Sequence, residues 1–200
     1  ARWREDLAGS WADLTSARLD GTGCIEVPRT RSLTVTDGDV VAVTLATTLP
    51  LGPAGTFEAW IKRSDLSRMT LLCIGDDASA PQCVVRVGTG LAFYNGQHWL
   101  PESGGLQADR WQHVAVTYDG RQVVYYIDGQ NVATLDAGTA FAPSADPLRI
   151  GQRGALPAAD NYRGLIDEVR MWRVARSPGE LRGNMYRTLA GTTADLLACF

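Results

Sequence analysis

Acidic side chains are the first candidates for chemistry in this sequence, which contains 22 of them. Hydrolysis of a glycosidic bond needs two carboxyl groups, one to protonate the leaving group and one to attack or to activate water. On a strand, side chains two residues apart share a face. Asp37 and Asp39 are the only acids with this spacing, and "TDGDVV" around them is typical of a turn into a strand. Asp167 and Glu168 are adjacent, so a strand would point them to opposite faces. The sequence therefore predicts no catalytic carboxylate pair, and a protein that is not an enzyme.

Histidine and cysteine offer few further options for catalysis or metal binding. The two histidines are His98 and His113, and His113 lies in the strand-like segment "WQHVAV", where we expect a structural role. Cysteines stand at positions 24, 73, 83 and 199 without a Cys-x-x-Cys pair, so we expect no zinc site. Cys73 and Cys83 flank an expected loop. They could form a cross-strand disulfide, and two buried free thiols are the alternative.

Aromatic residues beside hydrogen-bonding groups indicate a binding role, because sugar sites combine aromatic faces with polar groups. Two loop-like stretches have this composition, "FYNGQHWLPESGG" and "PAADNYRG". The candidate ligand-binding residues in them are Tyr94, Asn95, Trp99, Asn161 and Tyr162. We expect both stretches at the rim of the fold, where binding residues often lie. The alternative for Trp99 is an aromatic side chain that packs in the core or at a sheet edge.

Composition and charge exclude several other classes. Charged residues make up 20% and hydrophobic residues 45% of the chain, as in a globular domain. The net charge is −3 and Lys and Arg do not cluster, so we expect no nucleic-acid partner. No apolar run approaches the length of a membrane span. The sequence begins with neither a signal peptide nor Met, so we expect a single domain, residues 1–200, excised from a larger protein.

The elements that would position these residues are short strands separated by Gly, Pro and Asp turns. The stretch 110–135, "RWQHVAVTYDGRQVVYYIDGQNVATL", predicts three antiparallel strands with Asp119-Gly120 and Asp128-Gly129 at the corners, because both residue types adopt the backbone angles of tight turns. Further strands are expected in "GTFEAWIKRS", "MTLLCIG", "QCVVRVG", "GLAFYNG", "PLRIGQR" and "RGLIDEVRMWRVA". A short helix should begin at "SPGEL", with Ser177 as its N-cap. This set of elements predicts a β-sandwich or a β-barrel.

Four of these segments occur in an order that resembles a known family: "FEAWIK", "WQHVAVTYDG…VVYYIDGQNVA", "LRIGQR" and "YRGLIDEVRMWRVARSPGEL". Over residues 55–187 they are similar to laminin-G-like jelly-roll domains of the concanavalin A-like lectin/glucanase superfamily. "ARLDGTGCIEVP" at 17–28 resembles the opening strands of such domains, and "ADLLACF" at 194–200 is either the last strand or the start of a following module. The resemblance implies an all-β, two-sheet antiparallel jelly-roll sandwich with one short C-terminal helix.

The resemblance also implies a metal. Relatives hold one calcium ion on the convex side, where an Asp of a late strand meets backbone carbonyls of an early strand. Asp167 in "GLIDEV" matches the late position, and the turn "LDGTG", with Asp20 and Gly21, is the expected early contributor. Calcium takes several oxygen ligands, which a turn supplies. We therefore expect Asp20, Gly21 and Asp167 to hold a structural calcium ion. The alternative is that Asp167 caps a turn or pairs with an Arg.

Domains of this family bind glycans or proteins, and the resemblance implies a non-catalytic module of a larger secreted or surface protein, of bacterial origin. The first hypothesis is recognition of a glycan. The second is a protein-interaction or spacer domain of a multidomain adhesin or toxin, with surface proteins and other domains of the same polypeptide as partners. A glycoside hydrolase is a distant third, because the paired carboxylates are missing.

Overall fold

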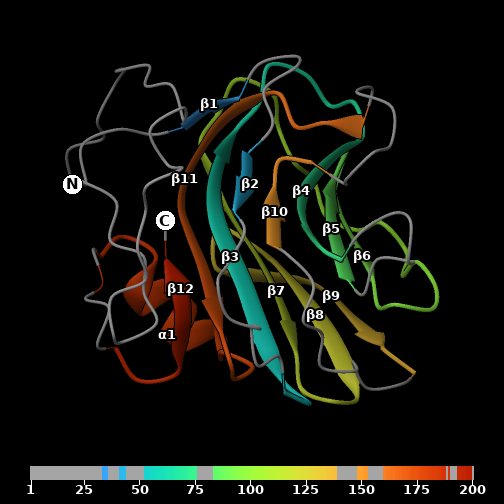
Figure 1. Cartoon of the computed structure of the whole chain (residues 1–200), viewed down its shortest axis with the longest axis vertical. Helices are drawn as coiled ribbons and strands as arrows, with labels where there is room; N and C mark the ends of the chain where they lie inside the picture. Colours follow the sequence, from blue (N-terminus) through green and yellow to red (C-terminus); the bar gives the residue numbers. More distant parts are fainter. Residues whose placement is uncertain are drawn as a thin grey trace.

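The computed structural model describes residues 33–35, 41–43, 52–75, 83–138, 148–152, 160–187, 189 and 193–199. These residues form two antiparallel sheets that stack face to face, with one short helix outside the larger sheet (Figure 1). The predicted all-β jelly-roll sandwich with a short C-terminal helix is confirmed. The opening strands expected at 17–28 and the pair Asp37 and Asp39 lie outside the described residues.

The larger sheet has seven strands in the order β1-β11-β3-β7-β8-β9, and β12 also pairs with β11. Their bounds are β1 Leu33–Val35, β3 Gly55–Lys62, β7 Gln112–Tyr118, β8 Gln122–Ile127, β9 Gln130–Asp136, β11 Gly164–Trp172 and β12 Leu196–Cys199. The predicted meander is confirmed, because β8 pairs with β7 on one side and with β9 on the other. Asp128 and Gly129 have φ of 50° and 72°, and Gly120 has φ of 92°, the left-handed angles expected of these corners.

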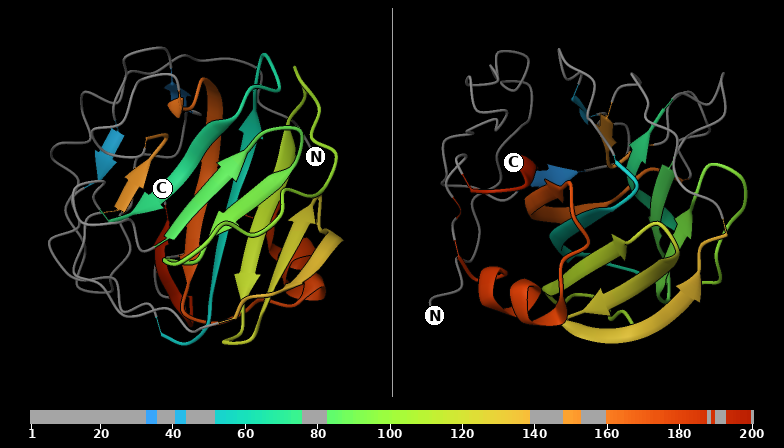
Figure 2. Two further views of the ribbon diagram at one scale, coloured as in Figure 1. Left: turned by 90° about the vertical axis from the view of Figure 1, so that its right-hand side faces the viewer. Right: turned by 90° about the horizontal axis from the view of Figure 1, so that it is seen from below.

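The smaller sheet has five strands in the order β2-β10-β4-β5-β6 and faces the viewer in the left panel of Figure 2. Their bounds are β2 Val41–Val43, β4 Met69–Ile74, β5 Cys83–Val87, β6 Leu91–Tyr94 and β10 Leu148–Ile150. β6 is the last strand in this order. The chain after it turns back along β6, with bridges from Tyr94 to Trp99 and from Leu91 to Ser103. This returning segment continues the sheet beyond β6.

The core lies between the two sheets and is built from alternate side chains of each strand. On β3 the side chains of Phe57, Ala59 and Ile61 share one face and are buried in the core. On β7 the corresponding face is Val114, Val116 and Tyr118. These side chains pack against alternate residues of the smaller sheet, including Val85, Val87, Leu91 and Phe93. The internal side chains of these strands thus follow the period-two alternation of strand geometry.

The opposite face of the larger sheet is buried by helix α1, Pro178–Asn184. The helix begins as predicted, since the Ser177 side chain accepts a hydrogen bond from the Glu180 amide and the Glu180 carboxylate accepts one from the Ser177 amide. Leu181 packs against Ala115 and Tyr126 of the sheet. Figure 2 (right panel) shows α1 lying against the sheet from outside. Within the described part of the chain, no helix is long and apolar enough to cross a membrane.

Cys73 and Cys83 are buried free thiols, so the disulfide that we considered between them is not formed. The strand register explains why. Cys83 pairs with Ile74, and Cys73 pairs with Val84. Because paired residues share a face and adjacent residues alternate, the two cysteines point to opposite faces of the smaller sheet. Burial raises the pKa of the Cys83 thiol, which makes it unreactive. Cys199, at the end of β12, is disulfide-bonded.

Candidate functional site

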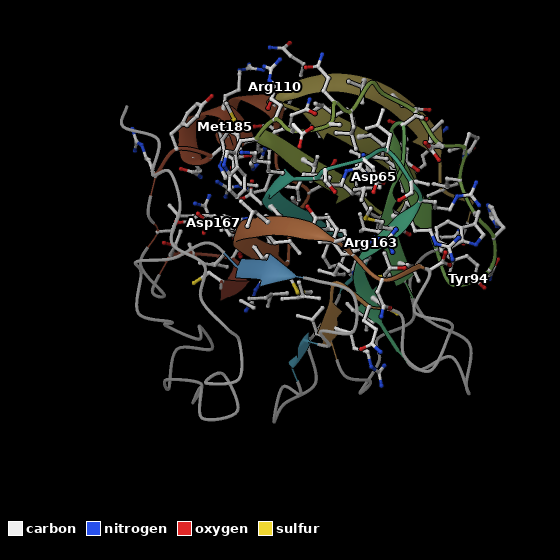
Figure 3. All side chains as sticks on the ribbon, turned by 90° about the horizontal axis from the view of Figure 1, so that it is seen from above. Asp65, Tyr94, Arg110, Arg163, Asp167 and Met185 are labelled. Carbon is white, nitrogen blue, oxygen red and sulfur yellow. The ribbon has the colours of Figure 1, made fainter. Side chains whose placement is uncertain are left out.

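Tyr94 and Trp99 form an aromatic pair where β6 ends. The tight turn between them brings the two residues into a β-bridge, and the Leu100 amide donates to the Phe93 carbonyl at 2.8 Å. The ring centroids are 5.4 Å apart and the ring planes are tilted by 47°. Both side chains are half-buried, and Figure 3 shows Tyr94 at the margin of the molecule. The pair is therefore held in a fixed geometry and still reaches the surface.

Arg86 and Asp160 complete this site. On β5 the neighbours Val85 and Val87 point into the core, so Arg86 points outward, on the same face as Tyr94. The Arg86 guanidinium carbon lies 4.2 Å from the centroid of the Trp99 ring. Its Nη2 donates to Asp160 Oδ2 at 3.0 Å, with 12% of the Arg86 side chain and 37% of the Asp160 side chain exposed. We call these four residues, Arg86, Tyr94, Trp99 and Asp160, the Arg86 cluster.

The Arg86 cluster joins the two stretches in which the sequence predicted binding residues. Tyr94 and Trp99 come from the first stretch, and Asp160 comes from the second. Arg86 itself was missed, because a single arginine in "CVVRV" has no distinctive spacing. The signal that could have found it is the alternation of that strand, which places Arg86 on the face opposite Val85 and Val87.

Asn95 was predicted to bind a ligand, but its amide is used within the protein. Its Nδ2 donates to the Ala137 carbonyl at 2.7 Å, and its Oδ1 accepts from the amides of Gln97 and His98. Only 4% of the residue is exposed. Asn95 therefore shapes the turn that presents Trp99, which is a positioning role.

Asn161 and Tyr162 were expected at the rim, and the structure corrects this placement. Asn161 is 5% exposed and bridges to Thr70, and Tyr162 is fully buried. The Tyr162 hydroxyl donates to the Leu165 carbonyl at 3.0 Å, and burial raises its pKa. Both residues pack the chain against the sheet. Their predicted role in ligand contact is unsupported, whereas the neighbouring Asp160 does reach the surface.

Asp167 lies on the opposite side of the molecule from Tyr94 in Figure 3. It is exposed, and its Oδ1 accepts a hydrogen bond from the Glu168 amide at 2.8 Å. The pairing of β11 with β3 shifts between Asp167 and Arg170, and Glu168 has φ of 50°. Asp167 thus caps a β-bulge. Asp20 and Gly21 lie outside the described residues, so their part in a calcium site stays a prediction. Within the described ranges, no three His, Cys, Asp or Glu side chains are grouped to hold a metal.

A second charged group is buried between the larger sheet and α1. Glu58 and His113 are 3.2 Å apart, each with 1% of its side chain exposed. Glu58 Oε1 accepts from Trp172 Nε1 at 2.9 Å and lies 3.5 Å from Arg170 Nη1. Burial would raise the pKa of Glu58, but the hydrogen bond and charge of His113, with Arg170 and Trp172, hold it below its usual value. A carboxylate beside an imidazole could act in acid–base chemistry, but burial denies this pair a substrate. Its burial beside Glu58 fits the structural role that we expect for His113.

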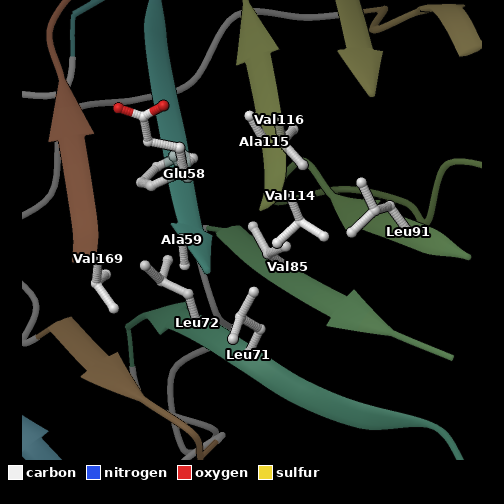
Figure 4. A pocket seen from close by; sticks show the side chains of 11 residues that line it. Glu58, Ala59, Leu71, Leu72, Val85, Leu91, Val114, Ala115, Val116 and Val169 are labelled. Carbon is white, nitrogen blue, oxygen red and sulfur yellow. The ribbon is translucent and has the colours of Figure 1, made fainter. Parts of the chain in front are cut away.

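Among the described residues, the gap between the sheets is too small to be an alternative site. A small gap there leaves about 10 Å³ for the centre of a water-sized sphere, which is room for a single water at most. Apolar side chains such as Ala59, Leu72 and Val114 line it, and Figure 4 shows the Glu58 carboxylate pointing away from them. The Arg86 cluster on the surface is therefore the better candidate for ligand binding.

Comparison with known proteins places the fold. The family model described as the concanavalin A-like lectin/glucanases superfamily matches residues 35–182. Mouse pappalysin-1 is 35% identical over 78 residues, which are 38% of this chain and 5% of pappalysin-1. The chain thus spans a small fraction of the length of the curated relatives that it matches.

Two solved structures illustrate the likeness in three dimensions. A proposed carbohydrate binding protein from Bacteroides ovatus has a TM-score of 0.62 and 24% identity, and the match covers 80% of this chain and 48% of that chain. The CBM40 module of a Ruminococcus gnavus IT-sialidase, bound to α2,3-sialyllactose, has a TM-score of 0.62 and 15% identity, with 77% of this chain and 95% of that chain covered. At these identities the likeness concerns the fold.

Proposed function

Because the chain belongs to the concanavalin A-like lectin/glucanase superfamily, we propose that it is a non-catalytic module that binds a glycan at the Arg86 cluster. The observation that carries the proposal is the pair of Tyr94 and Trp99, held 5.4 Å apart at the surface. Arg86 and Asp160 supply charged hydrogen-bonding groups beside these rings. Aromatic faces with a few fixed polar groups are the usual composition of a sugar site.

The backbone and side chains of the cluster are held in place by contacts within the protein. Such a preorganised site suits sugars, because each sugar contact contributes little binding energy. The bridge between Tyr94 and Trp99 and the buried amide of Asn95 fix the turn before any ligand arrives. Preorganisation lowers the entropy that is lost on binding. The Bacteroides ovatus protein and the CBM40 module, with the same fold, are both described as carbohydrate binding, and this supports the proposal by analogy.

The absence of catalysis is part of the proposal. Hydrolysis needs two carboxyl groups about the scissile bond. The Arg86 cluster contains one, Asp160, and Asp167 lies on the other side of the molecule. We also propose that the module works outside the cell or on its surface as part of a larger protein. Laminin-G-like domains are commonly extracellular, and the disulfide-bonded Cys199 suits an oxidising compartment.

A glycan array probed with the 200-residue chain tests the proposal. Trp99→Ala and Tyr94→Ala should each weaken binding to the glycans that the unmutated chain retains, by about three- to tenfold, because each removes an aromatic contact. Tyr186→Ala is the matched control. Tyr186 is 60% exposed, and its ring contacts the ring of Trp60. The substitution therefore removes a surface aromatic side chain outside the Arg86 cluster. Glycan binding that survives both cluster variants would place the site elsewhere. No retained glycan at all would favour the protein-interaction or spacer role.

A further inference from the structure

The Arg86 guanidinium is placed to receive a carboxylate. It is fixed on one side by the Trp99 ring at 4.2 Å, and only 12% of the side chain is exposed. A guanidinium stays charged at any physiological pH and binds a carboxylate through directed hydrogen bonds. A cation that is largely removed from water needs such a partner.

In this structure the carboxylate is supplied by Asp160. Asp160 Oδ2 lies 3.0 Å from Arg86 Nη2, and 37% of the Asp160 side chain remains exposed. Solvent therefore reaches the acidic side of the pair, while the cation remains nearly covered. Because Asp160 keeps this exposure, a carboxylate from a ligand can approach from solvent and take its place on Arg86.

We propose that the Arg86 cluster selects glycans that carry a carboxylate, such as those containing uronic or sialic acids. The sugar carboxylate takes the place of Asp160 on Arg86, and the sugar ring packs on Tyr94 and the accessible part of Trp99. The inference rests on the proposed function, which it deepens by naming the ligand class. Tyr94 and Arg86 lie on the same face of neighbouring strands, so one acidic sugar unit can contact both.

Asp160 makes the selection stricter. A neutral sugar cannot replace the charge of Asp160, so it must bind beside the intact ion pair or break that pair without restoring the lost charge. An acidic sugar restores the pair with its own carboxylate. Asp160 thus acts as an internal competitor that discriminates against neutral glycans.

Titration calorimetry with matched probes tests this inference. An oligogalacturonate is compared with its methyl ester, which keeps the sugar chain and removes the charge, and sialyllactose is compared with lactose. The first comparison reports uronic acids and the second reports sialic acids. The unmutated chain should bind at least one acidic probe and prefer it to its neutral counterpart.

Two substitutions should change this preference in opposite directions. Arg86→Gln should weaken binding of the acidic probe on the order of tenfold or more, because it removes a charge-assisted hydrogen bond. Asp160→Asn should strengthen it by about two- to fivefold, because the internal carboxylate no longer competes with that of the probe. Neither should alter binding of the neutral probe to the same extent. Far-ultraviolet circular dichroism and melting temperatures verify that both variants fold.

The controls make the same charge changes elsewhere. Arg173 and Asp195 form a surface pair 3.9 Å apart, with 55% and 47% of their side chains exposed. Arg173→Gln and Asp195→Asn should leave both probes unaffected. If the control substitutions changed binding to a similar extent, the net charge of the chain would explain the affinity changes, and the inference would be overturned.

The remaining outcomes separate the two proposals. Equal binding of acidic and neutral probes that still depends on Trp99 would refute the selection by charge and leave the glycan-binding function standing. Tighter binding of the acidic probe to Arg86→Gln would also refute it. Failure of the chain to bind any probe here and any glycan on the array would overturn both.

Discussion

At the scale of single residues, Glu58 is a carboxylate buried among charged and hydrogen-bonding groups. Its carboxylate is buried, yet its pKa is below the usual value because His113, Arg170 and Trp172 surround it. Arg170 in turn donates to the carbonyls of Asn184 and Arg187, at 3.0 and 2.5 Å. The carboxylate therefore holds the cation that connects the larger sheet to the chain around the end of α1.

Glu58→Gln should lower the free energy of unfolding at pH 7 by on the order of 2 kcal/mol or more, because it removes a buried charge that His113 and Trp172 contact and leaves Arg170 with Glu168 as its carboxylate partner. A second effect follows from the pKa. The folded value lies below the ordinary 4.5, so Glu58 contributes its stability above pH 4.5 and loses it as the pH falls through the folded value. Urea unfolding of the variant should therefore show a smaller loss of stability below pH 4.5.

Asp195→Asn, at an exposed carboxylate, is the control for this measurement and should keep the acid-dependent loss of the unmutated chain. The assignment to Glu58 would be wrong if Glu58→Gln and the unmutated chain lost stability in parallel between pH 4.5 and pH 3.

Single residues were also where sequence reasoning was least complete. Tyr94 and Trp99 could be identified because aromatic and polar residues gather in one stretch. Asn95 and Tyr162 have the same composition around them but are turned inward, and a sequence does not show which way a loop residue faces. The pairing of Arg86 with Asp160 joins residues 74 positions apart, which no local pattern encodes.

At the scale of elements, strand alternation and Asp-Gly turns located β3 to β9 well, because both are local properties of the chain. The β-bulge between Asp167 and Arg170 was not predicted. It places Glu168 at φ of 50° without a glycine, and the segment reads as a continuous strand. The bulge is imposed by pairing with β3, so it depends on a distant strand.

Gly164, at the start of β11, shows how closely these two strands approach. Its φ is 140°, and an added Cβ would lie 2.3 Å from the Lys62 carbonyl oxygen of β3. Gly164→Ala should therefore destabilise the protein by on the order of 2 kcal/mol or more in chemical denaturation. Gly183→Ala, in α1, has open space around the new methyl group and should instead stabilise by up to about 1 kcal/mol. Equal effects of the two substitutions would contradict this account.

At the scale of the whole molecule, the proposed calcium ion would connect a late strand to the first turn of the sequence. We propose Asp167 as its charged ligand, with carbonyls around Asp20 and Gly21. A ligand that binds only the folded chain stabilises it increasingly as its concentration exceeds the dissociation constant. The melting temperature should therefore rise with added calcium and fall in excess chelator.

Asp167→Asn refines this test. Asparagine can still accept the hydrogen bond from the Glu168 amide, so the cap on the bulge is kept while the charge is lost. The variant should melt lower than the unmutated chain in calcium and at nearly the same temperature in chelator. An equal difference in both conditions would assign Asp167 a purely structural role as a cap.

The contacts at the end of α1 also determine how long a segment must be transferred for this module to fold after domain shuffling. The family likeness ends at residue 182. Arg170 nevertheless donates hydrogen bonds to the carbonyls of residues 184 and 187, and the Trp60 indole donates one to the carbonyl of residue 185. In addition, β12 pairs with β11 up to Cys199. A shuffled segment cut at the end of the likeness would remove two carbonyl acceptors from the buried Arg170 guanidinium and one from the Trp60 indole N–H. The heritable unit therefore extends at least to residue 199, beyond the residues that the family model matches.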